Sequence, residues 1–168
     1  MNIKSIFEHN EEIPKPYTCL GANISPPLQF QDLPEGTESL VLIFEETDAT
    51  PKPWTHWMVF NIPAVTSRTE EGTIPSGGVE GLANNHSFGY EGPCPKYFKG
   101  VHHYWFRLYA LDRMLNLPAA SEREEVEEHM KGHIVGTAEL SGFVSSPKNS
   151  YLHYFLYSPI CITLYNYE

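Results

Sequence analysis

Four segments of the chain have the hydrophobic patterns of β-strands. Residues 39–45 form an apolar run that ends in a charged residue, which is typical of a buried strand. Residues 55–62 form a second such run, and Pro63 ends it. Residues 102–110 alternate between two sets of side chains, and residues 134–144 follow as a fourth strand. The patterns therefore predict a mainly β protein built around these strands.

One segment has the punctuation of an α-helix. Ser121 is placed to cap its N-terminus, Glu124 follows three residues later to complete a capping box, and Gly132 is placed to end it. Residues 122–128 include five glutamates, which we interpret as a solvated face because charged side chains are rarely buried without partners. Since no other segment has a comparable pattern, we do not expect a helix bundle.

Length and composition favour one domain of strands joined by turns. The chain has 168 residues, 13% of them aromatic, with 14 prolines and 12 glycines. No repeat or low-complexity linker divides it. We therefore predict a domain at 1–147, followed at 148–168 by an aromatic extension that packs on the domain or on a second copy.

Charge and cysteine content limit the partners and the compartment. The formal charge of −10, from 21 acidic and 11 basic residues, repels a nucleic-acid backbone, so no nucleic acid is expected as a partner. No apolar run reaches the length of about 18 residues that a membrane span needs, and the first residues show no secretory signal. Cys19, Cys94 and Cys161 are odd in number and widely spaced, which favours free thiols in a reducing compartment. The expected location is cytoplasmic.

Polar side chains with shared chemistry gather at the predicted strand ends. Each alone is more typical of a structural role: a histidine hydrogen-bonded in place, an Asx-turn aspartate or a packed tyrosine. Together, the imidazole N–H groups, a phenol and the amides of a Gly-Pro loop are donors suited to phosphate oxygens, and a carboxylate behind a histidine fixes its tautomer. We predict an anion pocket with the ligand-binding residues Glu46, Asp48, His56, Gly92, Pro93, His102 and Tyr104.

The sequence contains no P-loop, no Gly-x-Gly-x-x-Gly, no Gly-x-Ser-x-Gly and no zinc-finger spacing. We therefore expect no cofactor, no metal and no catalytic residue. Two alternatives stay open. One is a hydrolase-type enzyme that uses His56 and His102 as acid and base, with Glu46 or Asp48 as the orienting group and with or without a metal. The other is an interaction protein, for example a homodimer, that acts through the aromatic extension.

Several short motifs, taken in order, resemble the phosphatidylethanolamine-binding protein family, and its bacterial and archaeal Raf-kinase-inhibitor-like branch in particular. The resemblance covers residues 20–145 and depends on the combination rather than on any single motif. The matching motifs are Asn23-Ile24-Ser25-Pro26-Pro27-Leu28, Asp48-Ala49, Trp54-x-His56-Trp57, Asn61-Ile62-Pro63, Gly92-Pro93-Cys94-Pro95, His102-x-Tyr104, Tyr109-Ala110-Leu111-Asp112 and Lys131-Gly132-His133 with Ala138-Glu139-Leu140.

The resemblance implies a large antiparallel sheet packed on a smaller sheet, with one or two short helices. It also implies a pocket that takes phosphate, acetate, cacodylate or a phospholipid head group. Mammalian members of the family regulate kinases by binding them. We therefore expect a non-catalytic binding protein for phosphate-like anions or phosphorylated ligands, with a kinase-type protein as a further partner. The chain departs from the family at Glu46, where an aspartate is usual, and at His103, where an arginine is common.

Overall fold

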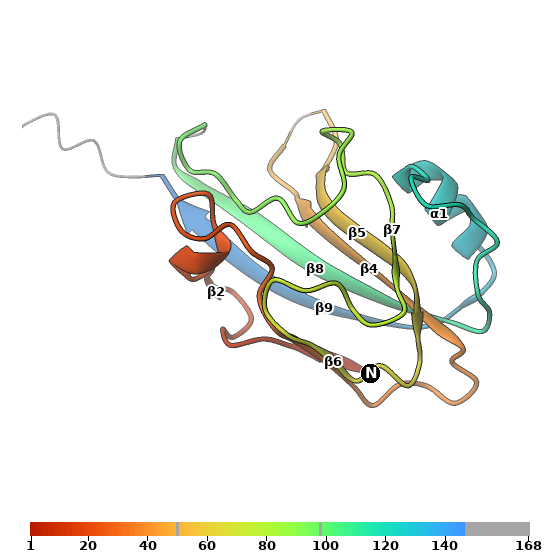
Figure 1. Cartoon of the computed structure of the whole chain (residues 1–168). Coiled ribbons are helices and arrows are strands. Elements are labelled where there is room, and N and C mark those ends of the chain that lie inside the picture. The colour runs from red at the N-terminus through yellow and green to blue at the C-terminus, as the bar shows by residue number, and fades with distance from the viewer. Residues whose placement is uncertain (50, 98, 147–168) are drawn as a thin grey trace, which may run out of the picture.

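The computed structural model describes residues 1–49, 51–97 and 99–146, and the extension predicted at 148–168 lies outside them. The described chain folds into two β-sheets with one α-helix and one short 3-10 helix (Figure 1). The elements are β1 (Asn2–Lys4), β2 (Glu11–Glu12), η1 (Lys15–Tyr17), β3 (Leu28–Gln31), β4 (Ser39–Glu46), β5 (Trp54–Pro63), β6 (Arg68–Thr69), β7 (Val79–Glu80), β8 (Val101–Leu111), α1 (Arg123–Met130) and β9 (Ile134–Ser145).

The large sheet has the strand order β2-β9-β8-β4-β5-β7, and the small sheet has the order β1-β3-β6. Neighbouring strands are antiparallel except β2 and β9, which are parallel. The four central strands of the large sheet are the four that the hydrophobic patterns predict. The mainly β, two-sheet fold class is confirmed.

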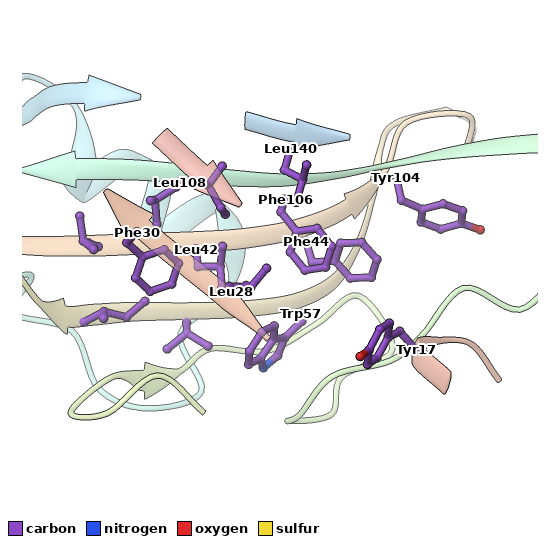
Figure 2. Packing of buried hydrophobic residues seen from close by; sticks show 14 of the residues in the cluster. Tyr17, Leu28, Phe30, Leu42, Phe44, Trp57, Tyr104, Phe106, Leu108 and Leu140 are labelled. Atoms are coloured by element: carbon purple, nitrogen blue, oxygen red, sulfur yellow. The ribbon is translucent and has the colours of Figure 1, made fainter. Parts of the chain in front are cut away.

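Each face of the large sheet covers its own core. One face, here called the pocket face, packs against the small sheet through Leu28 and Phe30 (Figure 2). The opposite face, here called the helix face, packs against Val126 and Met130 of α1. On β8 the even-numbered side chains from Tyr104 to Ala110 are buried on the pocket face, as the predicted alternation requires.

Strand β5 departs from simple alternation at its start. Phe44 pairs with Trp57, but Glu45 pairs with Thr55, so His56 is an extra residue in β5. Such a β-bulge changes the direction of the side chain at the extra position. Trp57 joins the core of the pocket face, and the His56 ring also lies on that face, 5.5 Å from the Phe44 ring. The bulge thus brings two consecutive side chains of β5 to one face.

The helix begins one residue later than the sequence punctuation predicts. Its N-cap is Glu122, and the capping box is completed by Glu125. The Ser121 hydroxyl donates instead to the carbonyl of Pro118, at 3.0 Å, so the expectation for Ser121 and Glu124 is wrong. Gly132 follows the C-cap with φ +79°, a left-handed conformation that favours glycine and ends a helix.

Among the described residues, the large sheet ends on both sides in strands of only two residues, β2 and β7. Both residues of β2 are exposed glutamates. No helix in the described part of the chain is long and apolar enough to cross a membrane.

Candidate functional site

Glu46 is the centre of a polar cluster on the pocket face. It is the last residue of β4 and pairs across the sheet with Tyr104 of β8 on one side and with Trp54 of β5 on the other. Its Oε1 lies 2.5 Å from Nδ1 of His102, and its Oε2 lies 3.3 Å from the hydroxyl of Tyr104. Its side chain is 13% exposed, so this carboxylate is largely shielded from water.

His56 faces the same carboxylate from β5. Its Nδ1 lies 3.0 Å from the backbone carbonyl of Glu91, and its Nε2 lies 3.6 Å from Glu46 Oε2. A carbonyl oxygen only accepts, so Nδ1 carries the proton and donates it to Glu91. Among the described residues, His56 Nε2 is the one buried side-chain nitrogen or oxygen without a hydrogen-bond partner. A buried polar atom of this kind calls for an explanation.

The cluster keeps Glu46 ionised. Burial raises the pKa of this carboxyl, but the neighbouring imidazoles of His56 and His102 outweigh burial, and the net shift of its pKa is downward. The pKa of the Tyr104 hydroxyl is raised, first by burial and then by the negative charge of Glu46. At neutral pH, therefore, Glu46 only accepts hydrogen bonds and Tyr104 keeps its proton to donate.

Aromatic packing holds the cluster in place. The ring of Phe44 stacks on Phe106 at 4.2 Å and on Tyr90 at 5.2 Å, and the His56 ring meets Tyr104 edge to face at 5.4 Å. Figure 2 shows Phe44 and Phe106 in contact and Tyr104 directed towards the end of the sheet. The hydroxyl of Tyr90 donates to the carbonyl of Tyr17 at 2.9 Å. Tyr90 was not among the predicted site residues, and only its position beside the Gly-Pro loop could have indicated it.

The Gly92-Pro93 loop supports the site differently from the prediction. The amide of Gly92 donates to Oδ1 of Asn23 at 2.9 Å, so the expectation that this amide is a free donor for a phosphate is wrong. A Cβ at Gly92 would lie 2.5 Å from the carbonyl oxygen of Tyr17, so only glycine fits this close approach. The carbonyl of Pro93 accepts from the amide of Cys19. The loop contributes to the cluster through the carbonyl of Glu91, which orients His56.

A disulfide between Cys19 and Cys94 fastens the same loop to the segment after η1. The expectation of free thiols is wrong for these two residues, and Cys161 lies outside the described residues. Disulfides of this kind are typical of oxidising compartments and of intracellular proteins from hyperthermophiles. The inference of a reducing compartment, which supported a cytoplasmic location, therefore loses its basis.

Asp48 lies apart from the cluster. Its Oδ2 accepts from the backbone amide of His103 at 2.6 Å and from His103 Nδ1 at 2.9 Å, and both side chains are about half exposed. Burial raises the pKa of Asp48, but these contacts with His103 dominate and lower it. The structure thus brings together Glu46, His56, His102 and Tyr104, and joins Asp48 to the outward-facing His103.

In the part of the chain that the structure describes, no group of three or more His, Cys, Asp or Glu side chains is arranged to hold a metal ion. The cluster at Glu46 combines a carboxylate with two imidazoles and a phenol. The fold and this cluster define a two-sheet β protein with a histidine–carboxylate cluster at the end of the central strands β4 and β8.

Comparison with known proteins identifies the class. The family model described as phosphatidylethanolamine-binding protein matches residues 3–145, so the chain belongs to this family. A UPF0098 protein of Methanothermobacter thermautotrophicus is 46% identical over 148 residues, which cover 84% of this chain and 97% of that protein. A UPF0098 protein of Pyrococcus horikoshii is 41% identical over 150 residues, covering 84% of this chain and 75% of the other.

Solved structures agree with this assignment. A phosphatidylethanolamine-binding protein homologue from Chlamydia trachomatis superposes with a TM-score of 0.81 at 40% identity, covering 86% of this chain and 96% of the other. YbcL of E. coli, described as a member of the mammalian family, superposes with a TM-score of 0.77 at 28% identity, covering 86% and 97%. The resemblance predicted from the motifs is confirmed.

Proposed function

We propose that the chain is a non-catalytic binding protein whose pocket at Glu46, His56, His102 and Tyr104 takes phosphate-like anions or phosphorylated ligands. The observation that carries this proposal is the buried Nε2 of His56, which has no hydrogen-bond partner among the described residues and lies 3.6 Å from Oε2 of Glu46. A ligand that bonds to this atom would satisfy it. Imidazoles and phenols are also donors suited to the oxygens of an anion.

Two features support binding rather than covalent chemistry. The side chains of the cluster are an acid, two imidazoles and a phenol, and Tyr104 is held in its neutral form because burial and Glu46 raise its pKa. A neutral phenol is a weak nucleophile. The pocket loop is fastened by the Cys19–Cys94 disulfide, which suits a preformed site.

Titration with inorganic phosphate, followed by amide chemical shifts, tests this proposal. We expect shifts around residues 46–56 and 90–104, and their loss in a His56→Ala variant. His103→Ala is the matched control, because His103 lies on the same strand as His102 but faces Asp48, and it should keep the shifts. If the folded His56→Ala protein shows the same shifts as the wild type, the proposed site is wrong.

A hydrolase is the second candidate, and one observation favours it. Nδ1 of His102 lies 2.5 Å from Glu46, which is the arrangement of an oriented acid–base histidine. Incubation with an aryl phosphate distinguishes the two functions. Turnover that is lost in His102→Ala would favour the enzyme, whereas saturable binding without turnover favours the binding protein.

A further inference from the structure

The disulfide between Cys19 and Cys94 joins two segments that lie outside both sheets. Cys19 lies in the turn after η1, and Cys94 lies in the loop between β7 and β8. Both residues are partly exposed, so thiols in solution have access to this bond. Because neither cysteine belongs to a strand or a helix, we expect the strand pairing of both sheets to survive reduction of the bond.

Hydrogen bonds also join these two segments, 17–23 and 90–94, which we call the cysteine segments. Among the described residues, these bonds run from Tyr90 to Tyr17, from Gly92 to Asn23 and from Cys19 to Pro93, at 2.9, 2.9 and 3.0 Å. Hydrogen bonds of irregular segments open locally more often than those inside a packed sheet. The disulfide keeps the cysteine segments together whenever these bonds open, so it controls how long the loop stays docked.

The loop that Cys94 fastens also holds His56. Glu91, three residues before Cys94, accepts the Nδ1 proton of His56 at 3.0 Å and donates its own amide to the His56 carbonyl at 3.2 Å. The hydrogen bond at one ring nitrogen of a histidine determines which of the two nitrogens carries the proton. The docked loop therefore fixes the His56 ring, with Nδ1 protonated and Nε2 3.6 Å from Oε2 of Glu46.

We propose that the Cys19–Cys94 disulfide is a thiol-exchange site that switches the anion pocket, so that the oxidised protein binds tightly and the reduced protein binds weakly. This inference rests on the proposed function, because it concerns the regulation of the same site.

A dithiol reductant supplies the two electrons. One of its thiolates attacks a sulfur of the protein disulfide, which breaks the S–S bond and forms a mixed disulfide. Its second thiolate then attacks the reductant's own sulfur in that mixed disulfide and releases the second cysteine. The products are Cys19 and Cys94 as thiols, which carry the two protons of the reductant, and the reductant as a cyclic disulfide.

Loss of the bond acts on the pocket through the loop. When the cysteine segments separate, the Glu91 carbonyl leaves His56, and the imidazole loses the acceptor that orients it. The apparent affinity for a ligand falls in proportion to the fraction of molecules whose site is competent. A drop of about fivefold corresponds to a loop that is docked in about one fifth of the reduced molecules.

Titration of the full-length protein with inorganic phosphate, followed by amide chemical shifts, tests the switch in three states: oxidised, reduced by dithiothreitol, and reoxidised. We expect the Kd for phosphate to rise about fivefold or more on reduction and to return on reoxidation. The imidazole nitrogen shifts of His56 are recorded without phosphate, at a pH where imidazoles are neutral. They should show a protonated Nδ1 in the oxidised protein and a mixture of both tautomers in the reduced protein.

Two variants assign the effect to this pair of cysteines. Cys161→Ser keeps the pair and removes the third cysteine, so it should respond to the reductant as the wild type does. The double variant Cys19→Ser/Cys94→Ser cannot form the bond, so it should bind phosphate as the reduced protein does, with or without the reductant. Unchanged amide shifts of α1 verify that the reduced protein is folded.

The outcomes are distinguishable. A bond that dithiothreitol leaves intact, or equal phosphate affinity or equal His56 shifts in the two states, overturns the switch and leaves the anion pocket in place. Loss of the α1 shifts on reduction also overturns it, because the bond would then be a structural cross-link. Binding of phosphate to neither state overturns the proposed function, and the inference with it.

Discussion

Glu45 and Glu46 are neighbours on β4, but they lie on opposite faces of the sheet in two different electrostatic environments. Glu45 faces the helix side, where its side chain is 2% exposed and both of its oxygens bind arginines, Arg107 of β8 and Arg123 of α1. Glu46 faces the pocket side, where it meets two imidazoles and a phenol. Two consecutive glutamates of one strand therefore have different partners: arginines at Glu45, and imidazoles and a phenol at Glu46.

The partners explain the difference in role. Arginines stay charged at every accessible pH and hold a carboxylate in a fixed geometry, which suits a structural pair that fastens α1 to the sheet. Histidines titrate near neutral pH and leave lone pairs that a ligand can satisfy. The carboxylate of Glu45, with both oxygens bound by arginines, is suited to stabilising the fold. The carboxylate of Glu46, which lies beside histidines, is suited to binding.

Removing the Cys19–Cys94 disulfide on the pocket side should cause the largest loss of unfolding free energy. Cys19→Ser removes a disulfide that closes a loop of 75 residues, and loop-closure entropy of that size amounts to about 4 kcal/mol of unfolding free energy. Urea unfolding measures this loss. Hydrogen exchange should show that the hydrogen-bonded amides of Glu91 and Gly92 lose protection before those of α1. An unchanged unfolding free energy, with the disulfide of the wild type verified by mass, would contradict this prediction.

Glu45→Gln should give the next largest loss. Removing one member of a buried ion pair costs about 3–5 kcal/mol, and because Arg107 and Arg123 keep some contact with water we expect about 2–3 kcal/mol here. Glu46→Gln is the natural comparison, because it removes the same charge one residue away, and it should cost about 1 kcal/mol or less. Urea unfolding at pH 7 measures both. Equal losses would mean that the two carboxylates do not differ in the way described.

The pH dependence should show the smallest effect. Since the folded pKa of Glu46 lies below its ordinary value of 4.5, the carboxylate stabilises the fold above that pH, and its contribution is lost as the pH falls through the folded pKa. The difference in unfolding free energy between wild type and Glu46→Gln should therefore shrink as the pH falls below about 4.5 and through the folded pKa. A difference that grows on acidification would give the opposite sign and refute the assignment.

The sequence could predict the strands because their patterns are local. The apolar run of β4 and the alternation along β8 each lie within one segment, and the structure confirms both. The helix could be predicted for the same reason, although its N-cap is Glu122 and not Ser121, because the first residue of a helix is less sharply defined by sequence than its interior.

The finer geometry of the site depends on contacts between distant segments, which no local pattern records. The disulfide joins Cys19 to Cys94 across 75 positions. The amide of Gly92 is taken by Asn23, 69 residues earlier. The bulge at His56 depends on the register between β4 and β5 and not on the identity of the histidine. The residues of the cluster could therefore be predicted, but not which of their donors are already occupied.

The short outer strands of the large sheet also affect how the protein can meet other chains. Long, flat and apolar sheet edges invite a further strand from another molecule, and such additions lead to fibres or to exchanged segments. In the part of the chain that the structure describes, one edge is the two exposed glutamates of β2, and the other is the two residues of β7. A peptide that paired with either edge would find few backbone hydrogen bonds to make, and at β2 it would meet negative charge. Even at high protein concentration, these two edges should therefore disfavour aggregation by strand addition.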